Sequence, residues 1–320
     1  RLNATVASID VDAKVVTLGQ NYRCTKNILT AATDVIEHNP GRSPKNLFTE
    51  NEPGNPVTIT EAGTEQEEAI LVADTIHQEV RAGHRRYGEY GILYRTNAMS
   101  RVLEEALLTL RVPHILVGGQ RFYERKEVKD LLAYLRVILN PRDEVSIRRV
   151  VNVPTRGLGA TSWAAIENRA TELGGDLWTA MHDQGVQASL QKKALFGLRS
   201  FIGVIEEGQD LVREHGRVTP IVQHLLNRSG YLEALRAEHT EEAISRMENL
   251  QELVNVTTQY DSTADEPSLG GFLEQVSLMA DVDQLVESGE AVTLMTLHSS
   301  KGLEFPVVFL VGMEEGVFPH

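Results

Sequence analysis

The sequence predicts an α/β protein in which a parallel-sheet domain is interrupted by a mainly helical inserted domain. Strand-like and helix-like segments alternate through the first third of the chain, helical periodicity dominates the middle, and strand-like segments return near the end. Alternation of this kind is typical of a parallel sheet with helices on its faces. The expected parts are residues 1–115 for the first portion of the sheet domain, 116–286 for the insertion and 287–320 for the second portion.

Each expected element has its own pattern. Short apolar runs predict strands, and apolar residues at helical spacing predict helices, with Thr25 as a plausible N-cap of the first helix. The expected strands are Val15–Leu18, Val57–Thr60, Tyr90–Tyr94, Ile115–Val117, Ala291–Thr296 and Val307–Val311. The expected helices are Thr25–His38, Glu65–Val80, Ser100–Leu110 and, within a helical stretch from Glu127 to about Leu285, a long one over Glu241–Tyr260.

Composition narrows the class of protein. The 320 residues carry 31 Lys and Arg against 45 Asp and Glu, a formal charge of −14, which argues against a protein that coats nucleic acid by bulk positive charge. The single cysteine, Cys24, allows no internal disulfide and favours a reducing, cytoplasmic setting. No run is apolar enough to predict a membrane span, so no membrane partner is expected. Because the chain starts at Arg1, we expect a piece of a longer protein.

Charge is distributed unevenly along the chain. Residues 81–160 contain 15 Lys and Arg and 8 Asp and Glu, a local net charge of +7, whereas residues 261–292 contain no Lys or Arg. A nucleic-acid-binding face, if present, is therefore expected to begin in the first half. The acidic remainder gives some weight to an alternative, a surface that binds a protein partner.

The segment Thr17–Thr25 reads T-L-G-Q-N-Y-R-C-T and lies where a strand gives way to a helix N-terminus, a place where α/β folds bind anions and nucleotides. Tyr22 could stack on a base while the Arg23 guanidinium reaches a phosphate. The alternative is structural, with Asn21 and Tyr22 tying down the turn. The residues alone leave both interpretations open.

A second polar turn follows the strand expected at Ala291–Thr296, with His298, Ser299, Ser300, Lys301 and Glu304 close together. Such a set could recognise hydroxyl and phosphate groups. The segment does not match the phosphate-loop pattern G-x-x-x-x-G-K-[ST], and no other stretch does. The chain therefore lacks a triphosphate cradle of its own.

Three segments of the basic region are candidates for DNA contacts. Arg95 and Asn97 follow an expected strand and could point at a backbone or base. Arg121–Lys126 mixes aromatic and basic residues, but could equally be a solvated helix start. Arg156–Ser162 offers two glycines ahead of a helix, which lets backbone N–H groups approach a phosphate but is also ordinary loop chemistry. The histidines lack metal-ligand spacing, so no metal site is expected within the chain.

Taken in order, these segments resemble the UvrD/PcrA/Rep group of superfamily 1 DNA helicases. Gln20–Arg23 resembles the group's motif IV, Asn152–Gly159 its duplex-contacting loop, and Leu294–Phe305 with Gly312–His320 its motif V and extension. Leu93–Glu105 and Val117–Asp130 resemble the segments between them. The resemblance implies the second RecA-like motor domain (2A) with its helical insertion (2B), and places the first motor domain, with the phosphate loop and magnesium-binding acids, outside this chain.

The resemblance also implies roles for individual residues. Tyr22 would stack on adenine and Arg23 would act catalytically on the γ-phosphate of ATP, with Gln20, Gly302 and Glu304 completing this half of the nucleotide site, Glu304 at the ribose. ATP and Mg²⁺ would be the cofactors, and both would need the N-terminal motor domain as partner. The residues expected to bind DNA, as single strand or duplex junction, are Arg95, Asn97, Arg156, Gly157, Gly159, Thr161, His298 and His320.

The expected function is thus the C-terminal half of an ATP-dependent 3′-to-5′ DNA helicase or translocase acting in repair or replication, with no ATPase activity in this chain alone. Two alternatives remain. One is a non-catalytic module that binds a repair factor or RNA polymerase through its acidic surface. The other is the motor part of a helicase–nuclease subunit of the RecB or AddA kind, which is disfavoured because those chains have longer insertions.

Overall fold

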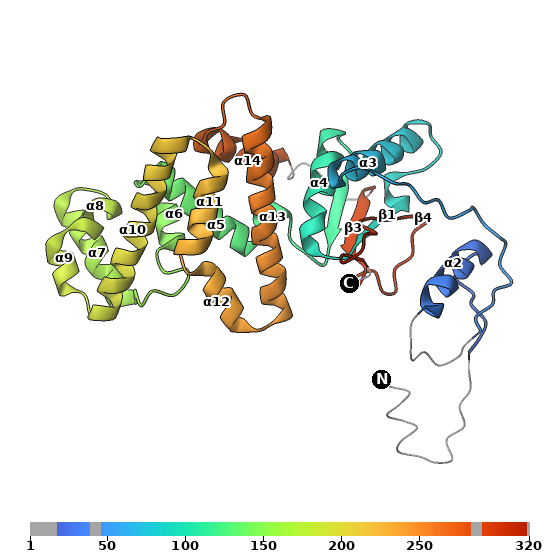
Figure 1. The fold of residues 1–320 in the computed structure, drawn as a ribbon, viewed down its shortest axis with the longest axis horizontal. Helices are drawn as coiled ribbons and strands as arrows, with labels where there is room; N and C mark the ends of the chain where they lie inside the picture. The colour runs from blue at the N-terminus through green and yellow to red at the C-terminus, as the bar shows by residue number, and fades with distance from the viewer. Residues whose placement is uncertain (1–17, 39–45, 283–289, 319–320) are drawn as a thin grey trace, which may run out of the picture. The chain divides into compact units, whose positions relative to one another are not determined.

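The computed structural model describes residues 18–38, 46–282 and 290–318. By its internal contacts the chain divides into two compact units, residues 1–62 and residues 63–320. Helices and strands are labelled in Figure 1. None of the helices in the described ranges is long and apolar enough to cross a membrane.

In the described part of the first unit, residues 18–38 and 46–62, the chain forms the helix α2 (Lys26–Glu37). Thr25 occupies the expected N-cap position, but its side chain makes no capping hydrogen bond. A single parallel bridge joins Gln20 to Phe48. Most of the strand expected at Val15–Leu18 lies outside the described residues.

The prediction of a strand at Val57–Thr60 is wrong. These residues form no strand, and Val57 and Ile59 are 54% and 93% exposed. Their alternation satisfies the sequence pattern of a strand, but a strand also needs a hydrogen-bonding partner, and none is seen beside them in the described residues.

The second unit contains a four-stranded, fully parallel sheet with the strand order β2-β3-β1-β4. The two central strands are the most buried, and β1 is buried along its whole length, as expected for a parallel sheet covered by helices. The strands are β1 (Tyr90–Tyr94), β2 (His114–Val117), β3 (Val292–Thr296) and β4 (Val307–Leu310). The predicted parallel sheet is confirmed.

Two helices pack on this sheet, α3 (Glu65–Arg81) and α4 (Ser100–Thr109). Thr64 caps α3 by accepting a hydrogen bond from the N–H of Glu67. Ile76 of α3 and Leu107 of α4 are fully buried and belong to the same apolar cluster as the sheet. The predicted helices Glu65–Val80 and Ser100–Leu110 are confirmed within one residue at each end.

Helices α5 to α14 all lie between β2 and β3 in the sequence. They are α5 (Lys126–Leu139), α6 (Glu144–Val150), α7 (Ala160–Leu173), α8 (Leu177–His182), α9 (Gln184–Ser189), α10 (Lys192–His215), α11 (Val218–Arg228), α12 (Tyr231–Glu238), α13 (Glu241–Thr263) and α14 (Leu269–Val282). Three short 3₁₀ helices complete the second unit, η1 (Tyr87–Glu89), η2 (Asn97–Met99) and η3 (Phe122–Glu124).

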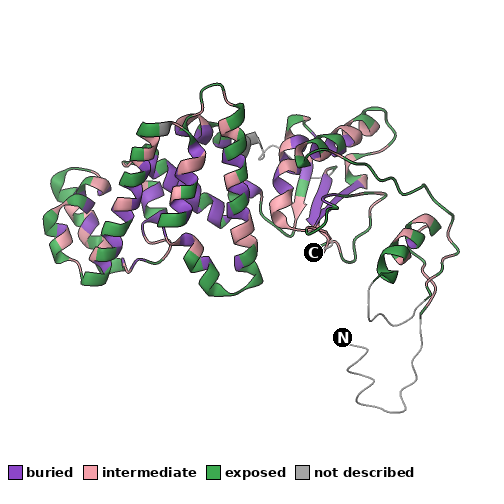
Figure 2. Ribbon diagram, in the orientation of Figure 1, coloured by how far each residue is buried: buried purple, intermediate pink, exposed green. Residues whose placement is uncertain are grey.

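The helical segment has an apolar cluster of its own, separate from the cluster around the sheet. Its centre is α5, in which ten of fourteen residues are buried and which packs against α6, α10, α11 and α13. Figure 2 shows the buried faces of these helices turned toward one another. Two separate cores agree with the expected fold class, a parallel-sheet domain interrupted by a helical insertion.

Candidate functional site

The turn Gln20–Cys24 in the first unit is held by asparagine side chains. The Asn21 Oδ1 atom accepts hydrogen bonds from the N–H groups of Arg23 (2.9 Å) and Cys24 (2.8 Å). From the other side, Asn51 Nδ2 donates to the carbonyl oxygens of Tyr22 and Cys24. The structural interpretation of Asn21 from the sequence is therefore confirmed.

This fixed turn presents Tyr22 and Arg23 at the surface. The Tyr22 side chain is 78% exposed, and its hydroxyl donates to Gln20 Oε1 at 2.7 Å. Arg23 is also exposed. An open aromatic ring next to a permanent positive charge is chemically suited to a base and a phosphate. This hydrogen bond from the Tyr22 hydroxyl to Gln20 orients the Tyr22 ring.

A second group of candidates lies where the central strands of the sheet end. Arg95 follows β1 and His298 lies just beyond β3, and the Arg95 Nη1 atom lies 3.2 Å from His298 Nδ1. Because a guanidinium has only donors, His298 Nδ1 is the acceptor, and the neutral ring then carries its proton on Nε2. This pairing leaves a cation and a ring N–H donor side by side at one edge of the sheet.

The neighbouring turns contribute to the same edge. Asn97 begins η2 directly after β1, and Gly118 and Gly119 follow β2. Gly118 has φ +77°, and a Cβ added there would lie 2.9 Å from Ser299 Oγ, so the turn after β2 closely approaches the turn after β3. Sequence reasoning missed Gly118 as a site residue, although a Gly-Gly pair directly after a strand was the signal that could have found it. We call Arg95, Asn97, Gly118, His298 and Ser299 the strand-end cluster.

In the loop between α6 and α7, the position of the Arg156 side chain differs from the one expected for a residue that binds DNA. Instead of an exposed phosphate-binding guanidinium, Arg156 is only 8% exposed, and its Nη2 donates to Tyr134 Oη (2.6 Å) and the Ser229 carbonyl (2.9 Å). Its Nη1 lies within 3.0–3.3 Å of the carbonyl oxygens of Val150, Val151, Val153 and Pro154. Because the loop folds around it, the Arg156 guanidinium is not open for the phosphate contact that the resemblance implies.

Arg156 also shapes its surroundings. Its guanidinium lies 5.7 Å from the Tyr134 ring centroid and 5.6 Å from that of Phe201. Burial raises the pKa of Tyr134 to about 12, with Arg156 opposing the rise. Helix α10 approaches the loop closely at Gly197, where an added Cβ would collide with the Arg156 carbonyl oxygen. Arg156 therefore holds this loop together through its hydrogen bonds to the surrounding carbonyl groups.

The end of the loop at the start of α7 is open to solvent, whereas Leu158 before it is buried. Gly159 is the N-cap residue of α7, without a side-chain cap, and Gly159, Ala160 and Thr161 are exposed. The first N–H groups of a helix lack intrahelical acceptors and can bind an anion. Gly157 has φ +77°, and its place next to Lys193 leaves no room for a side chain.

The remaining expected residues lie elsewhere. Gly302, with φ +93°, and Glu304 are exposed in the loop between β3 and β4. His320 lies outside the described residues. Within the part of the chain that the structure describes, no three His, Cys, Asp or Glu side chains gather as metal ligands. The structure thus brings together Arg95, Asn97 and His298, whereas Gln20, Tyr22 and Arg23 belong to the first unit.

Comparison with known proteins identifies the family. The model of the UvrD-like helicase C-terminal domain matches residues 16–320. The chain belongs to that family. The resemblance drawn from the motif order is therefore confirmed.

Individual relatives agree with the family model. The chain is 46% identical over 318 residues to the ATP-dependent DNA helicase PcrA of Bacillus subtilis (strain 168), covering 97% of this chain and 42% of that protein. It is 45% identical over 313 residues to PcrA of Staphylococcus epidermidis and 44% identical over 313 residues to PcrA of Staphylococcus aureus, with the same coverage. The chain spans about two fifths of the length of these relatives and is related to the C-terminal portion of PcrA.

Proposed function

We propose that this chain is the C-terminal part of an ATP-dependent DNA helicase or translocase that moves 3′ to 5′ on single-stranded DNA in repair or replication. The observation that carries the proposal is the pairing of Arg95 with His298 at the ends of neighbouring strands, in a chain that belongs to a helicase family. Arg95, Asn97 and His298 would contact the single strand, together with His320. Gly157, Gly159 and Thr161 would contact duplex phosphates through their backbone, which is exposed at Gly159 and Thr161.

The nucleotide half-site is proposed on the fixed turn of the first unit. The exposed Tyr22 ring fits a stacked adenine, Arg23 would reach the γ-phosphate, and Gln20 would hold the Tyr22 ring. Gly302 and Glu304 would complete the site, with Glu304 at the ribose. Bound ATP would supply the phosphoanhydride whose hydrolysis drives movement, and Mg²⁺ would neutralise charge on its phosphates. The phosphate loop and the metal-binding acids would come from an N-terminal motor domain.

The proposed domain organisation follows the two cores. Residues 1–115 and 287–320 would form motor domain 2A, and residues 116–286 would form insertion 2B. Helices α5 to α14, with their separate apolar cluster, support this division.

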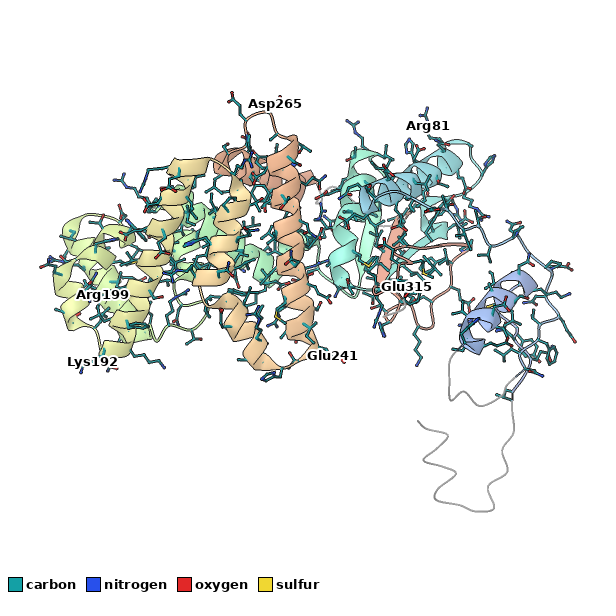
Figure 3. All side chains as sticks on the ribbon, viewed as in Figure 1. Arg81, Lys192, Arg199, Glu241, Asp265 and Glu315 are labelled. Carbon is teal, nitrogen blue, oxygen red and sulfur yellow. The ribbon has the colours of Figure 1, made fainter. Side chains whose placement is uncertain are left out.

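Steady-state ATPase kinetics of the full gene product test the nucleotide half-site. An arginine that stabilises the transferring phosphoryl group contributes about 10³- to 10⁵-fold to turnover, so Arg23→Ala should lower kcat far more than it weakens nucleotide binding. Tyr22→Ala should chiefly raise KM, because stacking is equal in the ground and transition states. Arg81→Ala, at the exposed end of α3 (Figure 3), is the control and should change neither.

An unchanged kcat in Arg23→Ala would contradict this assignment. The 320-residue chain alone should not hydrolyse ATP measurably, because it contains no phosphate loop. Turnover by the isolated chain at the rate of the full gene product would contradict the half-site in a second way.

A further inference from the structure

One buried side chain connects the strand-end cluster to the helical segment. Arg125, the N-cap residue of α5, is 6% exposed. Its Nη2 donates to the Asn97 carbonyl oxygen (2.9 Å) and to Ser100 Oγ (2.7 Å). Its Nη1 donates to Asn249 Oδ1 on α13 at 2.7 Å. A single planar group thus bridges the turn after β1 and a helix some 150 residues away in sequence.

The groups that bind the Arg125 guanidinium on α13 and on α4 are themselves oriented by hydrogen bonds. Asn249 Nδ2 donates to Glu127 Oε1 at 2.6 Å, so the amide turns its oxygen toward Arg125. At the other end, Ser100 Oγ accepts from Arg125 and donates to Glu104 Oε1 at 2.5 Å. These groups are all buried, so each is costly to leave without a partner.

A second arginine holds the same face of α13. Arg101 on α4, 2% exposed, pairs with Glu252, one turn beyond Asn249, and with Glu105 at 2.7 Å. It joins α13 to α4, and within the described residues its partners are Glu252, Glu105 and Glu65 rather than groups of the turn at Asn97. Helix α13 also packs directly on η2, and Arg125 adds a hydrogen-bonded connection from Asn249 on α13 to the Asn97 carbonyl oxygen.

Burial lowers the pKa of Arg125, and Glu104 opposes that effect. The guanidinium remains charged at neutral pH because an arginine pKa is far above 7. Its low exposure excludes a direct DNA contact. The residue acts on the DNA-facing edge only through its neighbours.

We propose that Arg125 is a positioning residue that sets the Asn97–Ser100 turn according to the place of α13, so that the helical segment controls how the strand-end cluster grips single-stranded DNA. The proposal rests on the DNA-binding role proposed above. The expected consequence is that a change on α13, in a residue that contacts no DNA, alters the turn and the DNA affinity together.

Amide hydrogen exchange of the full gene product without DNA tests the positioning. Asn249→Ala removes the acceptor on α13, and we expect exchange of the amides of residues 97–100 to rise about tenfold or more, the effect of losing one hydrogen bond to a charged group. Gln251→Ala, at an exposed position on the same helix, is the matched control and should leave these amides unchanged. Unchanged exchange in Asn249→Ala would overturn the proposal.

A double-mutant cycle separates action through Arg125 from direct packing of α13 on η2. In an Arg125→Met background, Asn249→Ala should add little to either exchange or DNA dissociation. Full additivity would overturn the proposal. Should Arg125→Met fail to fold, Arg125→Lys takes its place, because an ammonium keeps the charge but cannot reach all the acceptors.

The DNA measurement uses a single-stranded oligonucleotide. Asn249→Ala should raise Kd about threefold or more, and unchanged affinity despite faster exchange would overturn the proposal. Arg95→Ala separates the proposed DNA site from the positioning role of Arg125. An Arg95→Ala variant that binds DNA as tightly as wild type would contradict the DNA site. The exchange experiment decides independently whether Arg125 positions the turn.

Discussion

Arg95 and Arg156 carry the same chemical group, and the sequence assigns both to DNA, yet the structure treats them differently. Arg95 is partly exposed at the strand-end cluster, where its guanidinium contacts the ring of His298, which is itself exposed. Arg156 is buried and surrounded by six oxygen acceptors, five of them carbonyl groups. The first can bind a phosphate without rearrangement, and the second cannot.

The contrast shows that charge and motif position do not distinguish a contact residue from a residue that shapes the contact. In the loop between α6 and α7, the arginine organises the backbone and the exposed Gly159, Ala160 and Thr161 form the outer surface. The loop keeps its proposed duplex role, but the groups that would contact DNA are backbone N–H groups rather than the Arg156 guanidinium.

The largest expected effect is on stability at Arg156. Arg156→Ala leaves buried carbonyl oxygens and the Tyr134 hydroxyl without their donor, and we expect a loss of about 3 kcal/mol in the free energy of unfolding. Arg95→Ala should change it by less than about 0.5 kcal/mol. Urea denaturation of both variants measures the difference. Equal stability of the two variants would remove the distinction between these arginines.

Two glycines on α10, Gly197 and Gly203, test how closely this helix packs on the loop around Arg156. Gly197→Ala places a methyl group against the Arg156 carbonyl, and we expect a cost of about 2 kcal/mol from overpacking. Gly203→Ala on the same helix meets nothing within 4 Å and should stabilise by about 0.5–1 kcal/mol through helix propensity. Thermal unfolding of the two variants gives the answer. A stabilising Gly197→Ala would show that α10 does not press on the loop.

The smallest expected effect on the free energy of unfolding comes from removing a surface arginine, Arg142. Arg142 lies 3.2 Å from Asp176, whose carboxylate caps α8 by accepting from the Thr179 N–H at 2.8 Å. Asp176→Ala should cost about 1 kcal/mol through loss of the cap. Arg142→Ala should cost less than about 0.5 kcal/mol, because exposed ion pairs contribute little. Denaturant unfolding at pH 7 compares them, and a larger loss in Arg142→Ala would contradict this ranking.

The Asp176 contribution also predicts a pH dependence. The Thr179 N–H and, less strongly, Arg142 hold the pKa of Asp176 below its ordinary value. Its stabilisation is therefore fully present above the unfolded-state pKa of about 3.9 and is lost as the pH falls through the lower folded-state pKa. The gap in stability between wild type and Asp176→Ala should shrink below about pH 4.

The sequence predicted most of the fold because its patterns are local. The helices α3 and α4 and the strands β1 and β3 have clear periodicity and end within about two residues of their expected positions. Val57–Thr60 failed because alternation records which side chains could face a core, whereas a strand requires a partner from elsewhere in the chain.

The site was predictable only in part for the same reason. Arg95, Asn97 and His298 come directly after strands, so their place at the sheet edge follows from the topology. The burial of Arg156 depends on Tyr134 and on Ser229, 22 and 73 residues away, and no local pattern connects them. Arg125 lies in the basic and aromatic segment Arg121–Lys126, but its bond to Asn249 spans 124 residues, so the local sequence does not predict it.

The salt dependence of DNA affinity tests most directly the claim that Arg95 contacts DNA and Arg156 does not. The full gene product would be titrated with a duplex carrying a 3′ single-stranded tail over a series of salt concentrations. Arg95→Gln should reduce the slope of log K against log salt by about 0.7, the value for one single-strand phosphate, and Arg156→Gln should leave it unchanged. A slope reduced by about 0.9 in Arg156→Gln, or unaltered in Arg95→Gln, would contradict the account.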